Sequence, residues 1–265
     1  MKRVLGHVIA GSMLLGLAAV STSCADNYTS IIVRGVLAPP TANSSVCLYT
    51  ADPSQPMITS GVMDVAFTQL YTPAILVGNQ MLTRASRDNV RTETNRAVIK
   101  GVIAKVTDSN GAALSEFTRL ATTVVDPTTS NEPTYSSMSV TIVDAAAVKA
   151  ISKDMRVGET RRLVTTFKLF GETLGHTDVE SNEFEFPVDV CYGCLVGFPA
   201  DSVDKVLQGQ TGKPNCAATT AANATTGPGA CVSGQDQSVD CRSCVGRLDI
   251  CDPDKRASLP PYTAP

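Results

Sequence analysis

The stretch from Val98 to Val125, VIKGVIAKVTDSNGAALSEFTRLATTVV, decides the fold. Two runs rich in branched apolar residues flank the tetrapeptide Asp108 to Gly111, DSNG. Asn-Gly between apolar runs is a strong hairpin signal, because both residues tolerate a positive φ. The stretch therefore predicts a strand over 98–106 and a returning antiparallel strand over about 114–125.

Further short segments on both sides of the hairpin also have the character of strands. We expect them at 30–37, 46–49, 75–77, 138–143, 163–170 and 182–190. In the fourth, Met138 begins an alternation of apolar and polar residues, a period of two that buries one face. Asp144 before the alanine-rich run 145–151 predicts one short, N-capped helix. Seven or more short strands with one minor helix predict an all-β domain over 30–190, and the pattern favours an immunoglobulin-like β-sandwich.

The first 24 residues have the layout of a secretory signal. Lys2 and Arg3 precede a mostly apolar stretch from Val8 to Val20. This stretch is too short to span a bilayer as a permanent helix. The layout directs the chain to an oxidising compartment.

Small residues from Ser21 to Ser23 lead directly into Cys24. This end of the signal resembles the lipobox of bacterial lipoproteins. The resemblance implies a signal peptide over 1–23, a lipid on Cys24 and a tether over 24–29. Because Ala25 follows the anchor, it also implies an outer-membrane location. The alternative is conventional secretory cleavage after Ala25, which leaves a secreted or periplasmic protein without a lipid.

Eight of the nine cysteines follow Cys24, and an even number in an exported chain predicts disulfides. They are Cys47, Cys191, Cys194, Cys216, Cys231, Cys241, Cys244 and Cys251. Seven of them fall within a cysteine-rich module over 191–251. Cys47 has no cysteine near it in sequence, so we expect it to pair with one in the module. Residues 252–265 contain four prolines and little apolar mass, which predicts a disordered or loosely packed tail.

Two Cys-x-x-Cys pairs, Cys191/Cys194 and Cys241/Cys244, admit other chemistry. A tetrahedral zinc site is one alternative, although the gap of 46 residues between the pairs exceeds the usual spacing of roughly 15–20. A thioredoxin-like redox centre is the other, and it needs a low-pKa thiol, commonly at a helix start. The segment 195–199 is a poor helix start, so disulfides remain our preferred interpretation and no metal site is predicted.

A secreted hydrolase is an alternative from another functional class. His176 is the only histidine after the signal, and Glu183 and Glu185 share one face of a predicted strand, where paired carboxylates could act on glycosides. A solvated turn histidine and a solvated strand face explain the same residues, so we predict no catalytic residue. A calcium site would draw on three aspartates among the cysteines, which are Asp236, Asp240 and Asp249.

Charge and motifs exclude several classes of function. Loss of Lys2 and Arg3 with the signal moves the formal net charge from −3 to −5, and no long basic run offers a footprint for nucleic acid. No P-loop or dinucleotide fingerprint occurs, so no cofactor is predicted. We expect a non-enzymatic cell-envelope lipoprotein, attached to the membrane through Cys24, with a binding or structural role toward a protein or another envelope component.

Overall fold

The predicted hairpin is confirmed. In the computed structural model, which describes residues 30–40, 47–86, 91–198, 216 and 231–264, β5 (Ala97–Asp108) pairs antiparallel with β6 (Ala113–Val125). Gly111 takes a φ of 83° at the turn. The Asp108 carboxylate accepts hydrogen bonds from the backbone N–H groups of Asn110 and Ala112, at 2.8 and 2.9 Å, which closes the turn.

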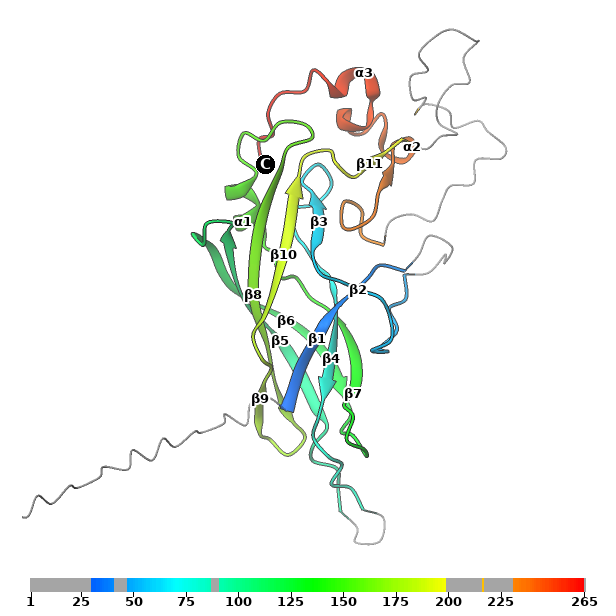
Figure 1. Cartoon of the computed structure of the whole chain (residues 1–265), viewed down its shortest axis with the longest axis vertical. Helices are drawn as coiled ribbons and strands as arrows, with labels where there is room; N and C mark the ends of the chain where they lie inside the picture. Colours follow the sequence, from blue (N-terminus) through cyan, green and yellow to red (C-terminus); the bar gives the residue numbers. More distant parts are fainter. Residues whose placement is uncertain (1–29, 41–46, 87–90, 199–215, 217–230, 265) are drawn as a thin grey trace, which may run out of the picture.

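This hairpin is one side of a larger sheet with the order β3-β10-β8-β5-β6. β8 (Thr160–Thr173) pairs antiparallel with β5 and with β10 (Phe184–Cys191). β3 (Gly61–Asp64) runs parallel to β10, and β9 (Asp178–Glu180) pairs with β8. The parallel pair brings the end of β3 beside the end of β10, where the cysteine-rich segment begins (Figure 1).

A second sheet has the order β2-β1-β4-β7. Its strands are β1 (Ile31–Leu37), β2 (Met57–Ile58), β4 (Ala74–Asn79) and β7 (Thr134–Ser139). Buried side chains of both sheets form one core, which includes Ile75 and Val77 from β4 together with Phe167 and Phe186 from the larger sheet. The fold is therefore mostly β, as the sequence predicts.

The short helix is also confirmed. α1 (Ala145–Ile151) begins after Asp144, whose carboxylate accepts from the Ala147 N–H at 3.1 Å. Ala147 and Val148 are buried in the shared core. Among the described residues, no helix is long and apolar enough to cross a membrane.

The cysteine-rich segment is built from very short elements around a small core of its own. They are β11 (Val196–Gly197), β12 (Val239–Asp240), α2 (Cys241–Cys244), the 3-10 helix η3 (Asp249–Cys251) and α3 (Pro253–Arg256). Four half-cystines, Val196, Val239 and Ile250 form this core. The segment lies at the end of the molecule opposite the start of β1 (Figure 1).

The strand predicted over 138–143 is displaced, because β7 runs from Thr134 to Ser139 and residues 140–143 belong to no strand. The strand predicted over 46–49 is absent from its described part. Cys47 to Tyr49 form no strand, because Cys47 is bonded to Cys231 and Leu48 points into solvent.

The structure describes the tail over 252–264. It forms α3 and then packs back on the β-domain, where the Tyr262 N–H donates to the Met155 carbonyl at 2.7 Å. Leu259 packs against the core of the cysteine-rich segment, and the ring of Tyr262 packs against the main core.

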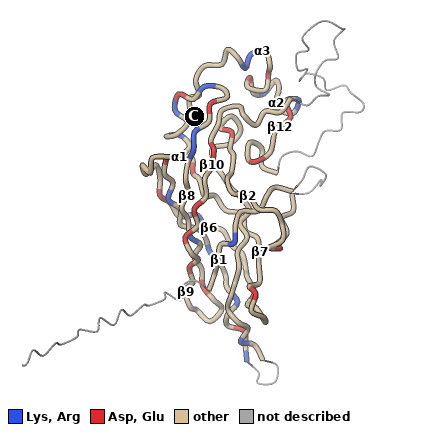
Figure 2. The backbone as a smooth tube through the Cα atoms, viewed as in Figure 1, with Lys and Arg blue, Asp and Glu red and all other residues tan. Residues whose placement is uncertain are grey.

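Charges of both signs are scattered along the strands (Figure 2). Several form cross-strand ion pairs. Arg162 of β8 pairs with Asp189 of β10 at 2.7 Å, and Lys168 of β8 pairs with Glu180 of β9 at the same distance. Such exposed pairs contribute little to stability. The shared apolar core must therefore supply most of it.

Truncating an aromatic side chain in the core should measure how much the shared core contributes to stability. We expect Phe167→Ala, at a side chain that is 1% exposed, to lower the free energy of unfolding by about 3–5 kcal/mol. Leu120→Ala on β6, where the side chain is 81% exposed, should change it by less than about 0.5 kcal/mol. Urea denaturation of both variants measures the difference, and equal effects would contradict the shared core.

Candidate functional site

The eight cysteines after Cys24 all lie in the described part of the chain and form four disulfides. The pairs, with Cα–Cα distances of 5.4 to 5.8 Å, are Cys47–Cys231, Cys191–Cys194, Cys216–Cys241 and Cys244–Cys251. The prediction that Cys47 pairs with the cysteine-rich segment is confirmed. Cys24, the predicted lipidation site, lies outside the described residues.

The two Cys-x-x-Cys pairs have different fates. Cys241 and Cys244 bond to different partners, so both pairs together build no zinc site here. Cys191 and Cys194, three positions apart, bond to each other. In the chain-entropy account, so short a loop contributes about 2 kcal/mol, against about 5 kcal/mol for the 184-residue separation of Cys47 and Cys231. The disulfide between Cys191 and Cys194 therefore contributes little to the stability of the fold.

A buried carboxylate lies beside this disulfide. Asp64 is the last residue of β3, and the parallel pairing sets it opposite Cys191 of β10. The ligand atoms of Asp64, Cys191 and Cys194 all lie within 4.8 Å of one another. Asp64 and Cys191 are buried, whereas Cys194 is exposed. Nothing in the sequence singles out Asp64, because one acid after a short apolar run leaves no periodic mark.

Backbone N–H groups satisfy the Asp64 carboxylate. Its Oδ1 accepts from Gly193 at 2.7 Å and from Ala66 at 3.0 Å, and its Oδ2 accepts from Leu195 at 3.0 Å. Gly193 and Leu195 flank Cys194, so the carboxylate fixes the loop that holds the disulfide.

Burial and hydrogen bonding act on Asp64 in opposite directions. Burial raises the pKa of the Asp64 carboxyl group, because its charged form is removed from water. The three backbone N–H groups and the positive charge of Arg256 lower this pKa, but the net shift is upward. Arg256 also donates to the Gly193 carbonyl at 2.6 Å, which ties α3 to the same loop.

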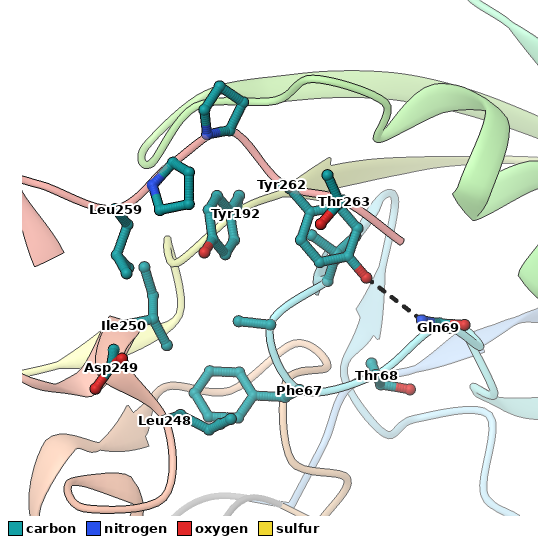
Figure 3. A pocket seen from close by; sticks show the side chains of 14 residues that line it. Phe67, Thr68, Gln69, Tyr192, Leu248, Asp249, Ile250, Leu259, Tyr262 and Thr263 are labelled. Carbon is teal, nitrogen blue, oxygen red and sulfur yellow. Dashed lines mark hydrogen bonds between the residues drawn. The ribbon is translucent and has the colours of Figure 1, made fainter. Parts of the chain in front are cut away.

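A groove of about 740 Å³ opens next to this loop (Figure 3). Four segments line it, which are the residues after β3, Tyr192, the region of η3 and the tail over 259–263. Three aromatic rings face it, from Phe67, Tyr192 and Tyr262, and the last two lie 5.3 Å apart between centroids. Gln69 Nε2 donates to the Tyr262 hydroxyl at 3.4 Å, which holds the tail against the strand end (Figure 3). No local sequence pattern marks the groove, because the four segments that line it are distant in the chain.

The three aspartates considered for calcium have separate partners. Asp236 accepts from the Tyr71 hydroxyl and from the Val62 N–H, both at 2.8 Å. Asp240 caps α2, and Asp249 pairs with Lys255 at 2.7 Å. Among the described residues these three carboxylates do not gather into a ligand group.

The residues considered for hydrolysis lie on the surface. His176 is exposed in the turn between β8 and β9, with a φ of 59°. Glu183 and Glu185 are exposed near the start of β10. This is the solvated arrangement that the sequence analysis prefers for them.

Comparisons with known proteins give no match, whether with protein-family models, with curated proteins or with solved structures.

Removing the Asp64 carboxylate should destabilise the fold. Asp64→Ala leaves three N–H groups without their acceptor, which should lower the free energy of unfolding by about 2–4 kcal/mol. Asp249→Ala is the matched control, because the Asp249 side chain is 59% exposed and its loss should cost less than about 0.5 kcal/mol. Urea denaturation at neutral pH compares the two variants. A loss no larger than the control's would show that the hydrogen bonds contribute nothing.

Proposed function

We propose that this protein is a cell-envelope lipoprotein, anchored by a lipid on Cys24, that binds a partner protein in the groove at its far end and catalyses no reaction there. The observation that carries the proposal is that the segments lining the groove lie at the end of the molecule opposite the start of β1 (Figure 1). The proposal also takes the β-domain to be an immunoglobulin-like sandwich.

Strand order supports the immunoglobulin-like part. In such domains strands A, B and E lie in one sheet, and G, F, C and C′ lie in the other. Assigned in chain order, β1, β4 and β7 take the places of strands A, B and E. The strands β10, β8, β5 and β6 then take the places of G, F, C and C′. The domain has no disulfide between strands β4 and β8, and the chain has no Trp, so the correspondence is one of topology. Immunoglobulin-like sandwiches commonly use the loops at one end for recognition.

The course of the chain supports display away from the membrane. β1 begins with Ile31, beside Asn79 and Ser181, at the end of the molecule remote from the groove. The residues between Cys24 and Ser30 can span at most about 20 Å. A lipid on Cys24 would therefore hold the β1 end near the bilayer and leave the groove facing outward. Four disulfides suit the oxidising compartment that the signal implies.

The lining of the groove favours a polypeptide as its occupant. Aromatic rings and prolines give large contact areas with few rotatable bonds, so ordering them on binding costs little. Thr68, Gln69 and Asp249 add polar groups at its edge. The disulfide Cys244–Cys251 closes the turn that carries Leu248 and Ile250, which fixes one wall before a partner arrives. We assign the groove to an extended segment of a partner protein with apolar side chains.

The anchor can be tested by intact mass. Mature protein from the native membrane fraction should weigh as much as a chain from Cys24 plus acyl groups, with eight alkylatable thiols only after reduction. Cys24→Ser should move the protein to the soluble fraction, whereas Cys47→Ser, which also removes one cysteine, should leave it in the membrane. A lipid-free chain that starts at Asp26 would reject the anchor.

The groove can be tested by photo-crosslinking in intact cells. A photoreactive residue at Tyr262 should give an adduct of defined mass with a protein, and Phe67→Ala in the same chain should reduce its yield severalfold. Leu82, which is 60% exposed and lies outside the groove, is the control position. Equal adducts at both positions, or adducts with lipid or glycan alone, would contradict protein binding in the groove.

A further inference from the structure

The disulfide between Cys191 and Cys194 differs from the other three in its surroundings. Its two sulfur atoms and a carboxylate oxygen of Asp64 lie within 4.8 Å of one another, the one such group of three found among the described residues. One sulfur belongs to a buried residue and the other to an exposed residue. An incoming thiolate can therefore reach Cys194, while Cys191 remains against the carboxylate.

The loop around this disulfide is held independently of the sulfur–sulfur bond. Asp64 binds the N–H groups of Gly193 and Leu195, and Arg256 donates to the Gly193 carbonyl. The Gly158 N–H donates to the Tyr192 carbonyl at 2.8 Å. Opening the disulfide would leave all four hydrogen bonds in place. The loop can thus alternate between dithiol and disulfide without loss of the fold.

We propose that Cys191 and Cys194 form a thiol–disulfide exchange site for cysteine pairs of polypeptides, with Cys194 as the attacked sulfur and Asp64 as the proton donor to Cys191. The exchange reaction needs neither the lipid nor a partner in the groove, so its test is independent of the test of the proposed function.

The exchange balances in two steps. A substrate thiolate attacks Cys194, forming a mixed disulfide, and the Cys191–Cys194 bond breaks with its electron pair on Cys191. The Asp64 carboxyl group passes its proton to that sulfur. The second substrate thiolate then attacks the substrate sulfur of the mixed disulfide and releases Cys194 as a thiolate. The substrate loses two electrons and gains a disulfide, and the pair gains both electrons. Glutathione disulfide, the oxidant proposed here, then restores the pair. The Cys194 thiolate attacks it and releases one glutathione thiolate; Cys191 returns its proton to Asp64, attacks Cys194 and releases the second.

The electrostatics of the loop explain why a proton donor is needed. A thiolate on buried Cys191 would be poorly solvated and would lie beside a carboxylate, so two negative charges would share one buried site. Transfer of the Asp64 proton leaves one negative charge, on the group that three N–H donors already stabilise. The other charged or titratable groups that act on this carboxylate are Arg256 and Tyr192.

The first experiment measures catalysis by the mature chain. A reduced peptide with two cysteines is mixed with glutathione disulfide, and its oxidation is followed by mass spectrometry with and without the protein. We expect an acceleration of about tenfold or more. Cys194→Ser should abolish it, and Cys191→Ser should accumulate a mixed disulfide at Cys194. Leu120→Ala on β6, whose side chain is 81% exposed and lies outside this loop, should keep the activity. No acceleration by folded wild-type protein would overturn the proposal.

The second experiment tests whether Asp64 donates the proton to Cys191. The ratio of wild-type to Asp64→Asn exchange rates cancels the ionisation of the attacking thiol. This ratio should exceed about ten at acidic pH and fall toward one as Asp64 loses its proton. If the Asn variant does not fold, glutathione exchange at Cys191–Cys194 is compared with exchange at Cys244–Cys251 within the wild-type molecule over the same pH range. A ratio that does not change with pH, in either comparison, would remove Asp64 from the mechanism.

Discussion

The interior position of the Asp64 carboxylate imposes the central constraint on this structure. A buried carboxylate is tolerated only where hydrogen bonds replace its lost hydration. As the last residue of β3, Asp64 lies between the N–H of Ala66, two residues further on, and the N–H groups of the loop after β10. The β-domain and the cysteine-rich segment are consequently joined by an ionisable group and not by apolar packing alone. The groove shares this junction, since Val65 to Gln69 directly follow Asp64 and Tyr192 directly follows Cys191, the residue paired with Asp64.

A second polar junction stabilises the same end. Asp236 reaches into the β-domain to accept from Tyr71 and Val62, and Gln235 accepts from the Thr72 N–H at 2.8 Å. Burial raises the pKa of the Tyr71 hydroxyl, and the Asp236 charge raises it further, so this donor keeps its proton. Because unpaired buried polar groups are costly, both junctions favour one orientation of the cysteine-rich segment over sliding alternatives.

Sequence patterns predict those parts of the fold that depend on local chemistry. Asn-Gly specifies the β5–β6 turn, and Asp144 caps α1 as expected, because both signals act within a few residues. The pairing of Cys47 follows from its isolation. Asp64 and the groove depend on contacts between distant segments, which no local pattern records. The prolines and charges that dominate the composition of the tail hide its two apolar contacts, of Leu259 with the cysteine-rich core and of Tyr262 with the main core.

The disulfides differ in how much stability they contribute, according to the length of the loop that each one closes. Closing the chain from Cys47 to Cys231 removes many unfolded conformations, so that bond contributes the most stability in the chain-entropy account. Cys191 and Cys194 close a loop that hydrogen bonds to Asp64 and Arg256 already define, so their bond adds little to the fold. A disulfide that contributes little stability can open at little cost to the native state. Reactivity is therefore compatible with the fold at this position, whereas opening Cys47–Cys231, which joins residues 184 positions apart, would cost more stability.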